Sequence, residues 1–307
     1  MKHISLMLEY FHPWTNSAGF YLARERGWYE AAGLDLEIRL FDPARGDTLA
    51  HLLRNEVHFG VFPSNRLLVR RENDEPLIGI AAINHGGLET IQTVKGSGIR
   101  RPRDLEGRRI AMGPTPRGIA MVNHLIANDG GDPKAAIVVD NHGREFTVDD
   151  IAAGEIDATF GGYWAWDALF GTLPDSERIT WRVDDIGAPP YHSYLLGTQE
   201  ALIQKQPEIV REFVSVSSRG YLAAAAEPAA ALAAMERVIP YFPRPILRRS
   251  IDLIAASWIH AGRWGEQRPE LLAPYAEWLN GNGILRSAGV WRSAVTNDFL
   301  PATSLAA

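Results

Sequence analysis

The stretch ISLMLEYFHPWTNSAGFYLARERGWYEAAGLDLEIRL, residues 4–40, decides the fold class of this chain. It begins with an apolar run, residues 4–8, that predicts a buried strand. Residues 18–32 predict a helix that ends at Gly33, a residue typical of helix C-termini. Residues 34–40 then alternate apolar and charged side chains, the pattern of a half-buried strand. Strand, helix and strand in this order predict parallel strands with a helix on one face.

The same alternation continues through most of the chain. Further strands are predicted at residues 59–62, 77–82, 109–112, 135–139 and 158–161, and helices at residues 47–55, 64–71, 119–128 and 148–153. From residue 199 onward the sequence predicts consecutive helices. We therefore predict an α/β fold of two lobes, each a mostly parallel sheet flanked by helices, with lobe 1 at residues 1–93 and 196–307 and lobe 2 at residues 94–195. We expect a ligand cleft between these lobes, beyond the carboxyl ends of the strands.

The composition excludes several classes of protein. Of the 307 residues, 46% are hydrophobic and 22% are charged, which is typical of a globular chain rather than a disordered one. The formal net charge of -6 argues against nucleic acid as a partner, because a phosphate backbone calls for a basic surface. The absence of cysteine excludes disulfides, thiolate nucleophiles, Fe–S clusters and cysteine zinc sites, and it excludes lipid attached through cysteine to the chain as given. No apolar run approaches the roughly 18 residues of a membrane span, so we expect no direct membrane insertion.

The N-terminus, residues 1–10, leaves two alternatives for the compartment. Its short apolar run is broken by Glu9, and neither the apolar region nor the cleavage site of a secretory signal is visible. The protein is extracytoplasmic, in the periplasm or at the cell surface, if a leader was trimmed. It is cytoplasmic if the chain is native and full length.

The loop after the first strand, residues 10–17, mixes aromatic rings with amide and hydroxyl groups. Phe11 and Trp14 offer faces on which a planar heterocycle can stack, and Asn16 can hydrogen-bond to the edge of such a ring. The alternative is a structural role, in which Asn16 or Ser17 caps the next helix and Trp14 covers the core.

Two further turns lie between a strand and a helix. Phe62 ends a strand and Ser64 opens a helix, so the hydroxyl and the helix N–H groups can meet a polar ligand, although capping alone also explains Ser64. Gly113 and Thr115 belong to the turn GPTPRG, residues 113–118, whose free N–H groups can bind an anion or a ring carbonyl. That turn lacks the lysine of a P-loop and its prolines remove donors, so phosphate binding is not indicated.

The segment GGYWAW, residues 161–166, carries the strongest site signal. Three aromatic residues follow two glycines at the end of a strand, where the backbone can approach a ligand closely. Tyr163 and Trp164 therefore predict an aromatic wall of the binding site, whereas Trp166 is expected in the core.

The remaining candidates give weaker signals. Tyr191 and His192 precede the return to lobe 1 and can line the cleft, although a lone histidine is more often structural. The nine histidines show no metal-ligand spacing, and no GxSxG motif occurs. Adjacent carboxylates at residues 149–150 and 184–185 fit solvated turns. We therefore expect a binding protein, with no catalytic residues, metal or cofactor.

Motifs spread over nearly the whole chain share the pattern of one family. They are GFYLA, GWY and AGLDLEI within residues 13–38, GSGI at 96–99, DLEGRRI at 104–110, GEIDA at 154–158, GGYW at 161–164 and TNDFLP at 296–301. These motifs resemble the NMT1/THI5-like family and, within it, the binding proteins for thiamine-pyrimidine precursors.

This resemblance implies a two-lobed periplasmic-binding-protein-like fold of type II, which closes over a small ligand and delivers it to the permease subunits of an ABC importer. The cleft residues that it implies are Phe11, Trp14, Asn16, Tyr163 and Trp164. The opening loop departs from the family's usual pattern, and the glutamate that pyrimidine binders carry near His192 is absent. The ligand therefore stays open between a pyrimidine, a flavin-like ring and another heterocycle.

The same family contains pyrimidine synthases, which use their own histidine and pyridoxal phosphate held on a lysine. Phe62 stands about where that lysine would fall and Arg66 about where the histidine would, and the cysteine motif of these enzymes has no counterpart. Phe62 has no amine for a Schiff base. We therefore expect the solute-binding component of an ABC importer for a thiamine-precursor pyrimidine; the alternative is a cytosolic pyrimidine-biosynthesis enzyme or ligand sensor on the same scaffold.

Overall fold

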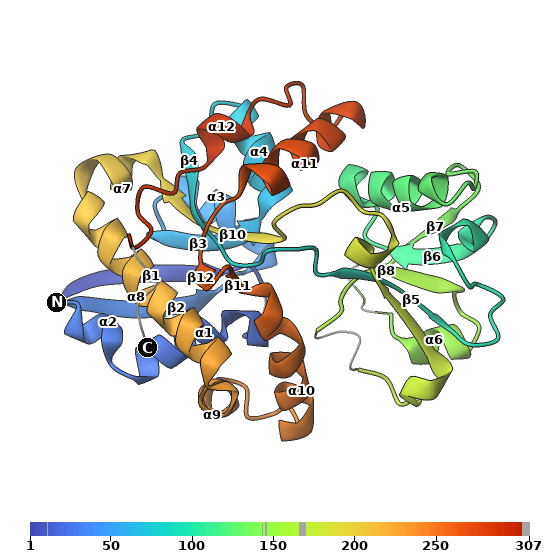
Figure 1. The fold of residues 1–307 in the computed structure, drawn as a ribbon, viewed down its shortest axis with the longest axis horizontal. Helices are drawn as coiled ribbons and strands as arrows, with labels where there is room; N and C mark the ends of the chain where they lie inside the picture. Colours follow the sequence, from blue (N-terminus) through green and yellow to red (C-terminus); the bar gives the residue numbers. More distant parts are fainter. Residues whose placement is uncertain (11, 143, 145, 166–169, 303–307) are drawn as a thin grey trace. The chain divides into compact units, whose positions relative to one another are not determined.

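The computed structural model describes residues 1–10, 12–142, 144, 146–165 and 170–302 (Figure 1). The chain forms two compact units. Unit 1 comprises residues 1–86 and 191–307, and unit 2 comprises residues 87–190.

The chain enters unit 2 earlier than the sequence pattern suggests. Strand β5, Glu89–Val94, pairs with β8 and β9 of unit 2, so the crossing lies before this strand rather than at residue 94. The return lies between Pro190 and Tyr191 rather than at residue 196. β5 was missed because it follows a loop and not a helix, so the strand–helix alternation carries no signal for it.

Unit 1 is built on a mixed five-stranded sheet with the order β2-β1-β3-β10-β4. Its elements are β1 Lys2–Leu8, α1 Ala18–Glu25, α2 Trp28–Ala31, β2 Leu34–Leu40, α3 Thr48–Leu53, β3 Phe59–Pro63, α4 Ser64–Glu72, β4 Leu77–Ala82, β10 Tyr194–Gln199, α7 Glu200–Lys205, α8 Pro207–Ala226, α9 Pro228–Val238, α10 Arg244–Ile254, β11 Ile259–His260, β12 Arg263–Trp264, α11 Pro269–Gly281 and α12 Trp291–Ala294.

The pairing of these strands brings four carboxyl ends to one edge of the sheet. β1 is parallel to β2 from Lys2 opposite Leu34 to Leu8 opposite Leu40, and it is also parallel to β3. β10 is antiparallel to both β3 and β4, so β4 runs in the same direction as the first three strands. The carboxyl ends of β1, β2, β3 and β4 therefore share an edge with the amino end of β10.

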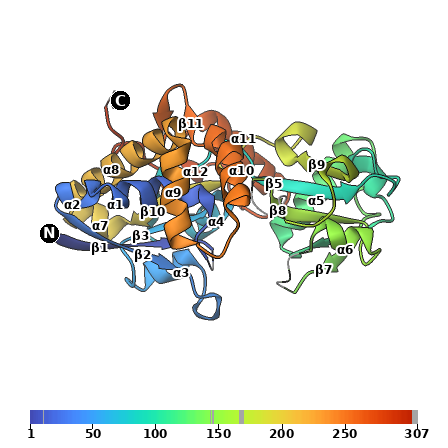
Figure 2. The same ribbon diagram turned by 90° about the horizontal axis from the view of Figure 1, so that it is seen from below.

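Helices cover both faces of this sheet. α1 packs against α8 and α9 on one face, and α3 lies on the other (Figure 2). Contact between α1 and α8 requires small residues, because a methyl group at Gly220 would overlap the carbonyl oxygen of Gly19. The single helix predicted over residues 18–32 is instead two helices, because Gly27 between them adopts a left-handed φ of 67°.

Unit 2 is built on a second mixed sheet with the order β7-β6-β8-β5-β9. Its elements are β5, β6 Arg109–Met112, α5 Pro116–Asn128, β7 Ile137–Asp140, α6 Val148–Ala152, β8 Ala158–Tyr163 and β9 Arg178–Arg182. β6 is parallel to β7 and β8, whereas β5 is antiparallel to β8 and β9. The carboxyl ends of β6, β7, β8 and β9 therefore share one edge. Within the described ranges, no helix has both the length and the apolar character needed to cross a membrane.

Candidate functional site

Each sheet has one point where the strand order reverses, and such points are where α/β sheets bind ligands. In unit 1 the chain passes from β1 outward to β2 and then returns to β3 on the other side of β1. In unit 2 it passes from β6 to β7 and returns to β8. The loops beyond the carboxyl ends of β1 and β3, and of β6 and β8, are therefore the candidate sites of the two units.

In the first loop of unit 1, Trp14 is part of an aromatic cluster. Its side chain is buried, with its ring centroid 6.1 Å from that of Tyr194 and 6.2 Å from that of Tyr10. Tyr194 begins β10, so this cluster ties the loop to the middle of the sheet edge. Phe11, the other predicted stacking residue, lies outside the described residues, as does Trp166.

Asn16 lies in a buried hydrogen-bond network. Its Nδ2 donates to Oδ1 of Asn84 at 3.0 Å, and its Oδ1 accepts from Asn84 Nδ2 at 2.8 Å and from Trp258 Nε1 at 3.0 Å. Its backbone oxygen also accepts from the Tyr221 hydroxyl at 2.8 Å. Asn16, Asn84 and Trp258 are all at most 2% exposed, so the network fixes the loop in place.

The second loop of unit 1 is joined to β10. Ser64 is buried, and its hydroxyl donates to the backbone oxygen of His192 at 2.5 Å, while its backbone N–H donates to the oxygen of Ser193. Phe62 is fully buried in the core. Tyr191 stacks on Tyr275 with 4.7 Å between ring centroids. Of the predicted residues, the structure thus brings Ser64 and His192 into contact and places Phe62 inside the sheet.

His192 has a defined tautomer. Its Nδ1 donates to the backbone oxygen of Asn84 at 2.9 Å, and its Nε2 accepts from the backbone N–H of Arg268 at 3.0 Å. Burial lowers the pKa of this imidazole to about 4, so it is neutral at pH 7. His192 and Asn16 thus both bind Asn84, which the sequence analysis missed because it comes after a strand with no motif around it.

Glu9 is a second residue that the sequence analysis did not single out. It follows β1 directly, and its side chain is 7% exposed, with Oε1 2.6 Å from Nη1 of Arg66. Desolvation outweighs the attraction of Arg66 and raises the pKa of this carboxyl to about 7. A carboxylate directly after a predicted strand was the available signal.

In unit 2, Trp164 is held by the backbone at the end of β8. Its backbone N–H donates to the oxygen of Leu88 at 2.9 Å, and its indole Nε1 donates to the oxygen of Gly87 at 3.1 Å. The guanidinium carbon of Arg182 lies 4.2 Å from the centroid of its ring. The side chain is 7% exposed, so the indole is both oriented and largely covered.

The other predicted residues of unit 2 are more open. Gly113 is exposed, and so is Thr115, which caps α5 by accepting from the N–H of Gly118 at 3.1 Å. Tyr163 ends β8 and is half-buried. Two charged residues missed by the sequence analysis stand beside them: Arg117, in the first turn of α5, forms an ion pair with Glu89 at the start of β5.

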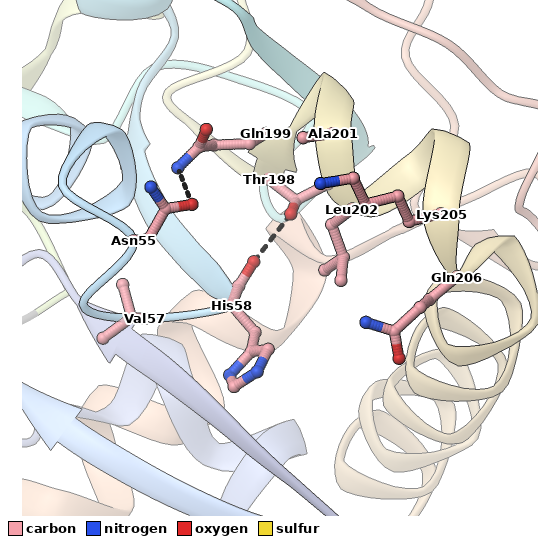
Figure 3. A pocket seen from close by; sticks show the side chains of 9 residues that line it. All are labelled: Asn55, Val57, His58, Thr198, Gln199, Ala201, Leu202, Lys205 and Gln206. Carbon is pink, nitrogen blue, oxygen red and sulfur yellow. Dashed lines mark hydrogen bonds between the residues drawn. The ribbon is translucent and has the colours of Figure 1, made fainter.

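A pocket of about 220 Å³ lies at the opposite edge of the unit 1 sheet, where β3 begins and β10 ends (Figure 3). Its lining residues are Asn55, Val57, His58, Thr198, Gln199, Ala201, Leu202, Lys205 and Gln206. None of the predicted site residues is among them.

The side chains at these loops fit binding by stacking and hydrogen bonds. In the part of the chain that the structure describes, no three His, Asp or Glu side chains are grouped so that they could hold a metal ion. The carboxylate–imidazole contact of His51 with Glu56 joins α3 to the segment that follows it.

Comparison with known proteins relates this architecture to binding proteins and also to an enzyme. The formylaminopyrimidine-binding protein of Halalkalibacterium halodurans is 21% identical over 221 residues, 72% of this chain and 66% of its own length. The periplasmic aliphatic sulphonate binding protein SsuA of Escherichia coli has the same fold, with a TM-score of 0.74, 12% identity and coverage of 96% of this chain and 92% of SsuA. The desulfurization enzyme DSZB also shares it, with a TM-score of 0.66, 14% identity and coverage of 96% and 97%.

The fold is therefore that of the periplasmic binding proteins, as the sequence motifs implied. The sequence pattern described as NMT1/THI5-like matches residues 14–231, which is most of the chain. The chain belongs to the NMT1/THI5-like family.

Proposed function

We propose that this protein is the solute-binding component of an ABC importer and that it captures a small planar heterocycle, first of all a thiamine-precursor pyrimidine. Its family and its similarity to a formylaminopyrimidine-binding protein support this proposal. The observation that carries it is Trp164, whose indole Nε1 donates to the oxygen of Gly87 and whose backbone N–H donates to the oxygen of Leu88, at the point where the unit 2 sheet reverses its strand order. A ring fixed in this way loses little conformational freedom on stacking with a ligand.

The predicted site residues divide into two groups under this proposal. Those with exposed or half-buried side chains or backbone contact the solute directly: Gly113, Thr115 and Tyr163. Those bound inside unit 1 act as supports that hold the loops in place: Asn16, Ser64 and His192. Trp14 and Trp164 are 4% and 7% exposed, and in this proposal the solute meets these small exposed parts.

The proposal includes a compartment and partners. A solute-binding component works outside the cytoplasm and hands its cargo to permease subunits, so we expect the mature protein in the periplasm or at the cell surface. Its partners are the heterocycle and those subunits, and not nucleic acid.

Calorimetric titration with formylaminopyrimidine, hydroxymethylpyrimidine and riboflavin tests the function. We expect saturable binding of one pyrimidine, and Trp164→Phe is expected to weaken it by about 10-fold because the indole hydrogen bond and part of the stacking surface are lost. Trp28→Phe, in helix α2 of unit 1, is the matched control and leaves the affinity unchanged. Absence of binding to all three compounds would contradict the proposal.

The alternative is an enzyme, since DSZB shares the fold. Incubation of the protein with each pyrimidine, followed by mass analysis of the small molecules, separates the two functions. Unchanged pyrimidine recovered after binding supports transport, and a new product supports the enzyme.

A further inference from the structure

Arg182 stands at the same edge of the unit 2 sheet as Trp164. β9 and β8 are both antiparallel to β5, so they are parallel to each other and end on the same side. Thr90 of β5 lies opposite Arg182, and its neighbour Glu89 lies opposite Tyr163. The last residue of β9 therefore reaches over the start of β5 toward the end of β8.

The guanidinium of Arg182 is oriented by the indole beneath it. Its central carbon lies 4.2 Å from the centroid of the Trp164 ring, a cation–π distance. The indole in turn is fixed through Gly87, whose oxygen accepts from Nε1 and whose N–H donates to Oδ2 of Asp184 at 2.8 Å. Residues 87, 164, 182 and 184 thus form one preorganised group within unit 2.

The donors of Arg182 are not used within the described residues. No carboxylate in the described ranges forms an ion pair within 4.0 Å of its guanidinium. Asp184 accepts a hydrogen bond from the Gly87 N–H and interacts with Arg182 only electrostatically, at a longer distance. Its Nε is buried there without a hydrogen-bond partner, whereas the side chain as a whole is half-buried. Arg117, the other arginine at this edge, differs because Glu89 neutralises it.

We propose that Arg182 binds an oxyanion, so that the preferred solute is a planar heterocycle bearing a phosphate, sulfonate or carboxylate group. The planar fork of an arginine donates two parallel hydrogen bonds to such a group, which matches donors left unused beside an aromatic ring. The heterocyclic part of this inference rests on the proposed function, but binding of the oxyanion can be tested without a heterocycle.

The first experiment uses sulfate alone and follows the indole N–H resonance of Trp164 by NMR, assigned from its loss in Trp164→Phe. We expect a saturable shift in the wild-type protein, little or none in Arg182→Met, and a weakened response in Arg182→Lys, which keeps the charge and loses the fork. Arg219→Met is the matched control, because Arg219 stacks at 3.7 Å on Trp28 in unit 1. The inference is overturned if the shift is not saturable or persists in Arg182→Met, which would mark an adventitious ion only.

The second experiment compares hydroxymethylpyrimidine with its phosphate by calorimetry. We expect the wild-type protein to bind the phosphate about 10- to 100-fold more tightly, since hydrogen bonds to a charged group contribute more than neutral ones. Arg182→Met should abolish this preference, so that the two compounds bind with equal affinity. Equal affinity for the two compounds overturns the inference, whereas failure of both to bind overturns the proposed function and leaves the sulfate experiment to decide on Arg182.

Discussion

The two strand-end regions of this protein use their polar side chains differently. In unit 1, Asn16, Ser64 and His192 are buried and hydrogen-bonded. Asn16 and His192 both bond to Asn84, and the Ser64 hydroxyl donates to the backbone oxygen of His192, just before β10. In unit 2, Thr115 is exposed and Arg182 has donors without partners among the described residues. The first region is therefore built for rigidity, and the second keeps hydrogen-bonding capacity for another molecule.

This difference predicts that the largest stability effects come from the unit 1 network. Asn16→Ala leaves the Nε1 of Trp258 and the amide of Asn84 buried with fewer partners, which costs about 3 kcal/mol of unfolding free energy. Urea denaturation measures the loss. Asn282→Ala, which removes one exposed hydrogen bond to the oxygen of Trp278, should cost less than about 0.5 kcal/mol. Similar costs for the two variants would contradict the rigidity of the network.

Glu9 gives the unit 1 region a pH dependence. Its folded pKa, about 7, is above its unfolded value, so the stability it contributes is fully present below about pH 4.5 and is lost as the pH rises through 7. The wild-type protein should therefore lose on the order of 2 kcal/mol of unfolding free energy between about pH 5 and pH 8. Glu9→Gln cannot ionise, so this loss should be absent from the variant.

Chemical denaturation across this pH range tests the Glu9 prediction. The control is Glu208→Gln, because Glu208 pairs with Lys2 on the surface and its pKa is lowered by hydrogen bonding. The unfolding free energy of that variant should fall between about pH 5 and pH 8 as it does in the wild-type protein. If the unfolding free energies of the wild type and Glu9→Gln change in parallel with pH, ionisation of the buried Glu9 carboxyl does not destabilise the protein and the prediction is wrong.

The cap of α5 provides a smaller test on the unit 2 side. Thr115→Ala removes the hydroxyl that accepts from the N–H of Gly118 and should destabilise unit 2 by about 1 kcal/mol, whereas Thr115→Ser should be nearly neutral. Hydrogen exchange should report faster opening of α5 and no change in α1. Equal exchange in both variants would indicate that the cap is not made.

The protonation state of His192 tests whether the unit 1 region is closed to water, and it can be measured without a substitution. Because burial lowers its pKa to about 4, the imidazole should remain neutral and protonated at Nδ1 at about pH 5.5. The ¹⁵N shifts of the ring measure this tautomer directly. An imidazolium at that pH would mean that the region is open to water.

Much of the fold could be predicted from local patterns, but several strands, among them β5 and β9, could not. The alternation of strands and helices identified β1, β2, β3, β4, β6 and β8 because each is a short apolar segment beside a turn. β5 and β9 carry alternating polar residues such as Thr90, Gln92 and Thr180 and pair antiparallel, so their pairing depends on residues far away in the chain. The mixed character of the unit 2 sheet follows from those pairings, and that of the unit 1 sheet follows from β10, which is antiparallel to β3 and β4.

The candidate site was predictable only as a set of loops. Aromatic residues after a strand, such as Trp14 and Trp164, mark strand ends in the sequence itself. Their hydrogen-bond partners are backbone groups and amides far away in the chain, such as Gly87 for Trp164, and no local pattern identifies them. For this reason Asn84, Glu89, Arg117 and Arg182 were missed, although Glu89 and Arg182 lie at strand ends and Arg117 opens a helix after a strand.

The sequence by itself determined the α/β class, the family and the absence of cysteine chemistry, because these depend on composition, periodicity and motifs that are local to the chain. Only the tertiary structure decided which polar side chains are consumed and which remain available. Asn16 was a candidate ligand-binding group in the sequence, whereas Arg182 was not. Burial beside Asn84 and Trp258 uses the donors and acceptor of the first, whereas the second is stacked on an indole and forms no ion pair within 4.0 Å in the described chain.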